Sequence, residues 1–278
     1  MKEAIAELRK TLGALGIQRG DIVYVASDIT LLMYIIQREY GVDNIDAFLD
    51  ECINIFEDTV TESGTLLFPM FTWAPCRGDT FNVRSSKSEV GALNNWVLRH
   101  RPEFVRTAHP MYSFFVWGKD TDQLVSLHNE SAWGEDSPFG YFHRNHAKML
   151  LIDVHLKQCY TFMHYVEEQI RVPYRYMKNF RINYIDKDGI ESERSYTMFV
   201  RDLAIDSIQH TPDDKLLETG IMTETKWLDI PVRLVDMAQS YSVYENDLRY
   251  NRGKWCYIFS SYELDWKGGQ THPDELNN

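Results

Sequence analysis

Short runs of β-branched and aromatic residues alternate with longer stretches of helical periodicity, and this alternation constrains the fold more than any other feature of the sequence. We interpret the runs as buried strands, at Ile22 to Ala26, Thr65 to Pro69, Ser113 to Trp117 and Met149 to Val154. Helical stretches between them include Asp46 to Phe56 and Ser88 to His100. The pattern predicts an α/β fold with a central mixed, largely parallel sheet flanked by helices, and such sheets bind ligands at the carboxyl ends of their strands.

The pattern changes beyond about Tyr174. Apolar and polar residues alternate from Phe180 to Asp186 and from Arg194 to Val200, and the Asp188-Gly189 pair between them favours a hairpin turn. Helical stretches are expected at Asp202 to His210, Asp213 to Thr219 and Pro231 to Tyr250, then a strand at Trp255 to Ser260 and a frayed tail from Lys267 to Asn278. We therefore expect an α/β domain over residues 1–175 and a smaller α+β subdomain over residues 176–278, packed tightly on the first.

The composition excludes several classes of protein. The 278 residues are 44% hydrophobic, and no run approaches 18 consecutive apolar residues, so neither a disordered nor a membrane-spanning chain fits. With 29 Lys and Arg against 41 Asp and Glu, the net charge is −12. This acidic balance argues against nucleic acid as a partner and is compatible with a small cationic substrate.

The N-terminal segment indicates the compartment, and the compartment in turn indicates the state of the cysteines. Residues Met1 to Leu15 have the spacing of an amphipathic helix and not of a signal peptide, so we expect a cytoplasmic protein. The cysteines, at positions 52, 76, 159 and 256, lack the close pairs of a structural zinc site and are expected to stay reduced. His143 and His146 have no third ligand nearby in the sequence, so we expect no metal.

Two clusters of residues could perform chemistry. His164 and Glu167 are three residues apart in a segment that enters a helix after a predicted strand, and an imidazole beside a carboxylate can accept a proton. Arg106, Thr107 and His109 offer several donors in a turn before Pro110, which suits phosphate or carbonyl oxygens. A solvated histidine and a turn that satisfies its own backbone are the simpler interpretations of these clusters.

Other polar residues follow the first two predicted strands. Ser27, Asp28 and Thr30 come after the first strand and Thr72 after the second, at the edge of the sheet where a ligand cleft is expected. The sequence lacks the glycine-rich dinucleotide motif, the phosphate-binding loop and the esterase nucleophile elbow.

Six segments carry a resemblance to a known family when they are taken together and in order. They are Gly20 to Ser27, Gly64 to Thr72, Val90 to Leu93, Arg106 to Pro110, Ser137 to Gly140 and Thr161 to Glu167. In these segments the sequence resembles the aminoglycoside 3-N-acetyltransferase family. The resemblance covers about residues 12–175, includes Val172 to Arg175, and fades over the rest of the chain.

The resemblance implies an acetyl-CoA-dependent transferase that acylates an amino group on a sugar, with an α/β fold distinct from the common acetyltransferase superfamily. The catalytic histidine of the family and its nearby glutamate correspond to His164 and Glu167. The segments that line the CoA site contain Ser27, Asp28, Thr72, Arg106, Thr107 and His109. The expected partners are therefore an amino sugar and acetyl-CoA or another acyl-CoA. We expect neither a membrane partner nor a bound metal, and the oligomeric state, including a homo-oligomer, stays open.

The chemistry of the residues agrees with that expectation. A protonated amine has no lone pair, so His164 is the candidate general base, and Glu167 would orient the imidazole or bind the substrate ammonium. Backbone amides near Ser27 and the Thr72 loop are candidates for binding the oxyanion. Direct transfer in a ternary complex is expected, because none of the cysteines matches a family position that would support an acyl-enzyme.

Two positions depart from the family pattern. Gln158 stands where an acidic residue usually precedes the histidine by six positions, and Asn95 stands where a glutamate often follows the Gly-Ala-Leu segment. We therefore favour an amino sugar other than an antibiotic, including nucleotide-linked sugars, and leave antibiotic resistance open. The alternatives are transfer of a longer acyl group from CoA, a hydrolase that pairs His164 with a serine, and a non-catalytic relative that binds CoA or sugar.

Overall fold

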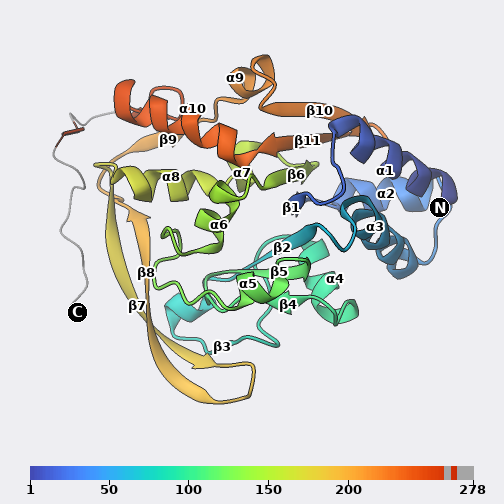
Figure 1. Ribbon diagram of the computed structural model, residues 1–278, viewed down its shortest axis with the longest axis horizontal. Helices are drawn as coiled ribbons and strands as arrows, with labels where there is room; N and C mark the ends of the chain where they lie inside the picture. Colours follow the sequence, from blue (N-terminus) through green and yellow to red (C-terminus); the bar gives the residue numbers. More distant parts are fainter. Residues whose placement is uncertain (260–263, 268–278) are drawn as a thin grey trace.

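The computed structural model describes residues 1–259 and 264–267 (Figure 1), and within these residues a seven-stranded sheet has the order β10-β11-β6-β1-β2-β5-β4. Its strands are β1 (Ile22–Ser27), β2 (Thr65–Phe71), β4 (Val105–Arg106), β5 (Tyr112–Gly118), β6 (Lys148–Ile152), β10 (Met222–Trp227) and β11 (Ile230–Asp236). β1 pairs in parallel with β2 and β6, and the other neighbours are antiparallel. The predicted mixed α/β sheet is confirmed, with parallel pairing at its centre.

Helices cover both faces of this sheet, because its central strands are buried on both sides. In β1 the side chains of Val23 and Val25 pack into one core, and those of Tyr24 and Ala26 pack into the other. One core is covered by α1 (Lys2–Leu15), α2 (Thr30–Arg38), α3 (Ile45–Val60) and α4 (Ala92–His100). The other is covered by α6 (Pro138–Arg144), α8 (Phe162–Ile170) and α10 (Met237–Tyr250), on the opposite side in Figure 1.

Shorter elements connect these layers. They are the 3₁₀ helix η1 (Ala74–Arg77), α5 (Thr121–Val125), α7 (Leu156–Cys159) and α9 (Asp213–Glu218). Among the described residues, no helix is both long and apolar enough to cross a bilayer.

A long hairpin forms a second sheet. Its strands β7 (Arg175–Ile185) and β8 (Glu191–Arg201) are antiparallel, and β3 (Phe81–Asn82) is parallel to β7. The hairpin predicted around Gly189 is therefore confirmed, and its strands are longer than the sequence pattern indicated. Figure 1 shows it extending along one edge of the molecule from the end of α8, whose C-cap residue Arg171 lies over the ring of Phe199 in β8.

Two expectations for the second half of the chain are wrong. The helix expected at Asp202 to His210 is absent from the described structure. Residues 202–206 form an irregular turn, and β9 (Ser207–Gln209) follows as a strand because it pairs with β12 (Tyr257–Phe259). The first part of the stretch from Pro231 to Tyr250 is β11, and the helix begins only at Met237, after Asp236 caps it. The predicted tail at residues 268–278 and the end of the last predicted strand, Ser260, lie outside the described residues.

The N-terminal helix packs against a strand from the second half of the chain. The indole of Trp227 in β10 donates a hydrogen bond of 2.9 Å to the carbonyl of Ala4, and its ring stacks on Phe48 of α3. β10 and β11 thus extend the main sheet beside β6. The division into domains at residue 175 stays a prediction.

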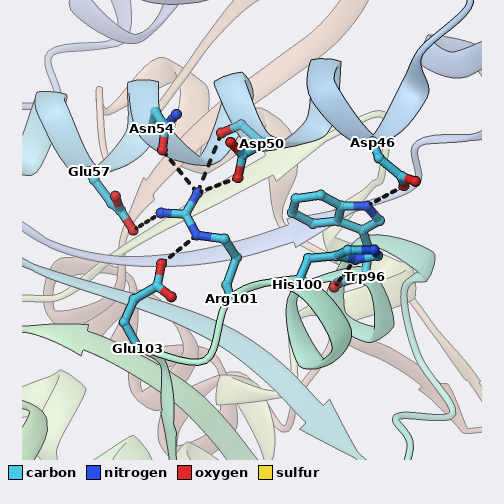
Figure 2. Close-up of polar contacts among 8 residues, drawn as sticks. All are labelled: Asp46, Asp50, Asn54, Glu57, Trp96, His100, Arg101 and Glu103. Atoms are coloured by element: carbon cyan, nitrogen blue, oxygen red, sulfur yellow. Dashed lines mark hydrogen bonds and ion pairs between the residues drawn. The ribbon is translucent and has the colours of Figure 1, made fainter.

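The connection after α4 is attached to α3 by a buried arginine (Figure 2). The side chain of Arg101 is 8% exposed. Its guanidinium donates to Asp50, Asn54 and Glu57 of α3 at 3.2, 3.0 and 2.7 Å and also contacts Glu103. Burial raises the pKa of Glu57 even though the charge of Arg101 opposes it.

Candidate active site

Helix α8 holds the predicted histidine and glutamate at the end of the sheet where β1 and β6 finish. Nδ1 of His164 lies 2.8 Å from Oε2 of Glu167, as the three-residue spacing on one helix allows. Glu167 is fully buried, whereas 24% of the His164 side chain is exposed. The rings of Trp133 and His164 pack in a T-shaped arrangement, with ring centroids 4.9 Å apart.

Glu167 is surrounded by donors from distant parts of the chain. Oε2 forms an ion pair of 2.8 Å with Nε of Arg175, and Oε1 accepts hydrogen bonds from the hydroxyls of Tyr174, at 2.8 Å, and Tyr257, at 2.7 Å. Nη2 of Arg175 also lies 2.9 Å from Nδ1 of His164. The carboxylate is therefore fixed on both oxygens, which fixes the imidazole beside it.

These contacts set the ionisation of the pair. Burial would raise the pKa of Glu167, but the charge of Arg175 and the hydrogen bonds from His164 and Tyr257 outweigh it and lower the pKa to about 2. The pKa of His164 is lowered, first by burial and then by the charge of Arg175, against the opposing effect of Glu167. At neutral pH the pair is a carboxylate beside a neutral imidazole.

The carboxylate determines which ring nitrogen carries the proton. An ionised carboxylate only accepts hydrogen bonds and a guanidinium only donates them, so Nδ1 can form a hydrogen bond with Glu167 or with Nη2 of Arg175 but not with both. The contact with the buried carboxylate favours the tautomer with the proton on Nδ1. Nε2 then keeps its lone pair. This is the tautomer that a general base needs.

His164 opens on a cavity of about 570 Å³. The cavity lies at the carboxyl ends of β1 and β2, beside the start of α4 and the end of α7, as expected for a sheet of this kind. Its lining residues are Tyr24, Ala26, Ser27, Asp28, Thr30, Pro69, Phe71, Trp73, Val90, Gly91, Ala92, Asn94, Tyr112, Val154, Gln158, Cys159, Thr161 and His164. Ser27 and Asp28, predicted from the sequence, thus share a cavity with His164.

Thr72 lies next to this cavity without lining it. Its hydroxyl donates a hydrogen bond of 2.8 Å to Glu89, and the same carboxylate accepts the amides of Trp73 and Ala74. The amides of Asp28 and Thr72 donate to Ile152 and Met111. The amides of Asp28, Thr72, Trp73 and Ala74 therefore already have acceptors, whereas the buried hydroxyl of Ser27 has no hydrogen-bond partner among the described residues.

The residues Arg106, Thr107 and His109 do not line the His164 cavity. The guanidinium of Arg106 is buried and donates to Ser113 and Met70, and it lines a separate cavity of about 370 Å³. The hydroxyl of Thr107 accepts the amide of Phe114. His109 is buried beside another cavity of about 350 Å³. The role of these three residues, and of Thr72, in binding CoA stays a prediction.

Sequence reasoning did not assign the residues that hold Glu167. Tyr174 and Arg175 lie in a segment that carries the family resemblance, and their distance of seven and eight positions from Glu167 could have indicated a contact. Tyr257 is 90 residues away from Glu167 and reaches it only because β12 pairs with β9, which no local pattern shows.

Cys159 is the cysteine that lines the cavity. Burial and the charge of Asp213 raise the pKa of its thiol to about 12, so it is protonated at neutral pH. A protonated thiol is a poor nucleophile, which agrees with direct transfer. All four cysteines of the described chain are free.

The fold is that of the aminoglycoside acetyltransferases. It matches the crystal structure of aminoglycoside acetyltransferase AAC(3)-Xa with a TM-score of 0.71, at 19% identity and over 87% of this chain and 91% of that one. It matches AAC-IIIb, in a binary structure with CoASH, with a TM-score of 0.70, at 20% identity and over 89% and 96% of the two chains.

The sequence defines the family. The model of the aminoglycoside 3-N-acetyltransferase family matches residues 41–249, and the chain therefore belongs to this family. It is 26% identical over 203 residues to the SPbeta prophage-derived aminoglycoside N(3')-acetyltransferase-like protein YokD of Bacillus subtilis (strain 168), which covers 64% of this chain and 68% of YokD. The resemblance predicted from six segments is confirmed, and the protein is an acyltransferase of the aminoglycoside N-acetyltransferase type.

Proposed function

We propose that the protein transfers the acetyl group of acetyl-CoA directly to the amino group of an amino sugar, with His164 as the general base. One observation carries the proposal: Nδ1 of His164 is held by a buried, ionised Glu167, which leaves Nε2 as the basic nitrogen at a cavity of about 570 Å³. That volume suits the reacting ends of two substrates. The CoASH bound to AAC-IIIb supports the choice of donor.

The reaction begins with the neutral amine in the cavity. Its nitrogen attacks the thioester carbonyl while Nε2 of His164 takes a proton from it, and the carbon–nitrogen bond forms. The tetrahedral intermediate then expels the sulfur of CoA, which takes the proton back from His164. The products are the amide and free CoA, and the imidazole returns to its neutral form.

The surrounding residues stabilise each stage. Glu167 stabilises the imidazolium that forms when His164 accepts the proton, and Tyr174 and Tyr257 keep that carboxylate in place. The unpartnered hydroxyl of Ser27 is our candidate donor to the oxyanion.

The CoA phosphates bind outside this cavity, because no Lys or Arg is present among its described lining residues. The segment from Arg106 to Tyr112 runs between the two parts of the site, since Tyr112 lines the His164 cavity whereas Arg106 and His109 line neighbouring ones. Lys187 and Arg194 of the hairpin region line the same cavity as Arg106, where they form ion pairs with Asp188 and Asp186. The placement of Arg106 and His109 supports the predicted assignment of the Arg106 to His109 segment to the CoA site, whereas Ser27 and Asp28 line the His164 cavity.

We also propose the cytoplasmic location that the sequence predicts. The cysteines are unpaired in the described structure, and unpaired cysteines are typical of proteins in a reducing compartment.

A thiol-release assay with acetyl-CoA and a panel of amino sugars tests the function, with the mass of each product as the second measurement. We expect thiol release that depends on the amine and a product heavier by one acetyl group.

His164→Gln should lower kcat by about 10²–10⁴-fold and leave CoA binding intact, whereas His210→Gln, at an exposed site, should change neither kcat nor CoA binding. Release without an amine would indicate a hydrolase, and an unchanged rate in His164→Gln would remove His164 from the mechanism. Propionyl- and hydroxybutyryl-CoA, tested in parallel, separate acetyl transfer from transfer of a longer acyl group.

A further inference from the structure

The cavity at His164 carries little charge. Among the described residues that line it, Asp28 is the one carboxylate, and neither lysine nor arginine contributes to the wall. Glu89 is close to the wall at Trp73, but its Oε1 already accepts from Thr72, Trp73 and Ala74, and it forms an ion pair with Arg77.

Asp28 is available to a ligand. It lies at the end of β1, is exposed at the rim of the cavity, and uses Oδ1 to accept the amide of Thr30 at 2.9 Å. No lysine, arginine or histidine of the described chain forms an ion pair with it. Burial and the charge of Asp28 raise the pKa of the neighbouring Asp153, which does not line the cavity, so Asp28 is the carboxylate of the wall that attracts a cation at the entrance.

The remaining polar groups of the wall are neutral. Oδ1 of Asn94 and the hydroxyl of Ser27 are buried without a hydrogen-bond partner in the part of the chain that the structure describes. Gln158 accepts the amide of His155 at Oε1, at 2.9 Å. Trp73 and Tyr112 supply aromatic surface. Uncharged hydroxyls and the apolar faces of a sugar ring match such a wall.

This distribution of charge selects among amines. Every ammonium group that enters the cavity loses part of its hydration, and a group that finds no carboxylate does not recover that free energy. A polycationic acceptor would bring several ammonium groups to one carboxylate, near the positive charge of Arg175 behind His164. An acceptor with one amino group brings only the charge that Asp28 attracts, and it becomes neutral by releasing that proton before it attacks.

We propose that the acceptor is a sugar with a single amino group and several hydroxyls, and that Asp28 and Gln158 at the rim of the cavity determine this specificity. The inference rests on the proposed function and names the class of its acceptor. Asp28 attracts the ammonium form, and the neutral amide of Gln158 gives a second ammonium group no counter-charge.

The test compares two acceptors, methyl 2-amino-2-deoxyglucoside with one amino group and kanamycin with several, by thiol release from acetyl-CoA at low ionic strength. We expect kcat/KM to be about tenfold higher for the monoamine. Asp28→Asn should raise the KM of the monoamine by about fivefold, the effect of one partly exposed ion pair. Preference for kanamycin, while both amines are acetylated, would overturn this inference and leave the proposed function standing.

Gln158→Glu provides the converse test, because it adds a carboxylate at the rim and retains the oxygen that accepts the amide of His155. The ratio of kcat/KM for kanamycin to that for the monoamine should rise by about fivefold. The matched control is Gln123→Glu on exposed α5, which adds the same charge away from the cavity and should leave the ratio unchanged. An unchanged ratio in Gln158→Glu would overturn the inference. Absence of thiol release with every amine would instead overturn the proposed function and the inference with it.

Discussion

The hydroxyl of Tyr257 donates a hydrogen bond of 2.7 Å to Oε1 of Glu167, across 90 residues of sequence. The segment that carries Tyr257 is held in turn by Asp247 of α10, whose carboxylate accepts the amides of Trp255 and Cys256. The carboxylate beside His164 is thus positioned by the last part of the chain that the structure describes.

Tyr257→Phe should lower kcat by about three- to tenfold, the effect of losing one hydrogen bond to a buried charge, and should leave the KM for acetyl-CoA unchanged. The reason is that Glu167 loses one of the donors that stabilise its ionised form. Steady-state kinetics provide the measurement. Tyr250→Phe, at a tyrosine that is 81% exposed, is the matched control. A purely structural role would appear as loss of folded protein with normal kcat in the remaining fraction.

The activity should fall in acid as His164 becomes protonated. Because burial and the charge of Arg175 lower the pKa of His164, the inflection in kcat/KM should lie below its ordinary value of 6.5. Above that inflection Nε2 is free to accept a proton, and below it the imidazolium cannot act. The same inflection should be found with two acceptors whose amines have different pKa values. An inflection that follows the acceptor would instead report ionisation of the amine.

Arg175→Gln should move this inflection to higher pH, because the variant removes a positive charge 2.9 Å from the imidazole. It should also lower kcat, since Glu167 loses its ion pair. The pH profile of kcat/KM in the variant provides the measurement. Lys178→Gln removes a positive charge from the same strand, away from the Glu167 contacts, and serves as the control. A shift to lower pH would contradict the electrostatic role given to Arg175.

Arg101→Met should lower the free energy of unfolding by about 1–3 kcal/mol at pH 7.5, because it leaves the carboxylates of Asp50, Glu57 and Glu103 without their cation (Figure 2). The pKa of Glu57 is already raised in the folded state, so its ionised form opposes folding as the pH rises. Removing the cation increases that effect. Urea unfolding should therefore show a larger loss at pH 7.5 than at pH 5, and an equal loss at both would contradict this account.

Gly140→Ala should lower the free energy of unfolding by about 2–4 kcal/mol, because an added Cβ would lie 2.1 Å from the carbonyl oxygen of Glu135. Gly13→Ala is the matched control. Gly13 is exposed in α1, and an added Cβ would have no described atom within 4 Å outside the local backbone of its own helix. The change should therefore stabilise the protein by about 0.5–1 kcal/mol. Both values follow from denaturant unfolding, and equal stability of the two variants would contradict the steric argument.

The sequence predicted the elements that local patterns determine. The strands β1, β2, β5 and β6 and the pair of His164 and Glu167 were found because apolar runs and helical spacing are local properties. The antiparallel strands β10 and β11 were not found, because their place in the main sheet depends on pairing with β6. The helix expected at Asp202 to His210 was wrong because its apolar pattern includes Leu203, whose side chain is 83% exposed in the structure.

The residues of the site divide in the same way, into those that local sequence patterns indicate and those that depend on long-range pairing. Ser27 and Asp28 were predicted to lie near a ligand because the ends of parallel strands meet at one edge of a sheet, and they do line the His164 cavity. Tyr257 could not be predicted, because its contact with Glu167 depends on the antiparallel pairing of β9 with β12.

The position of β11 beside β6 has a consequence for the order in which the protein is made. Until a ribosome has released the chain through Asp236, the nascent protein has an open strand edge at β6, and the underside of α1 lacks the indole of Trp227. The first half of the polypeptide must therefore wait, exposed to chaperones and to other nascent chains, for a strand translated much later.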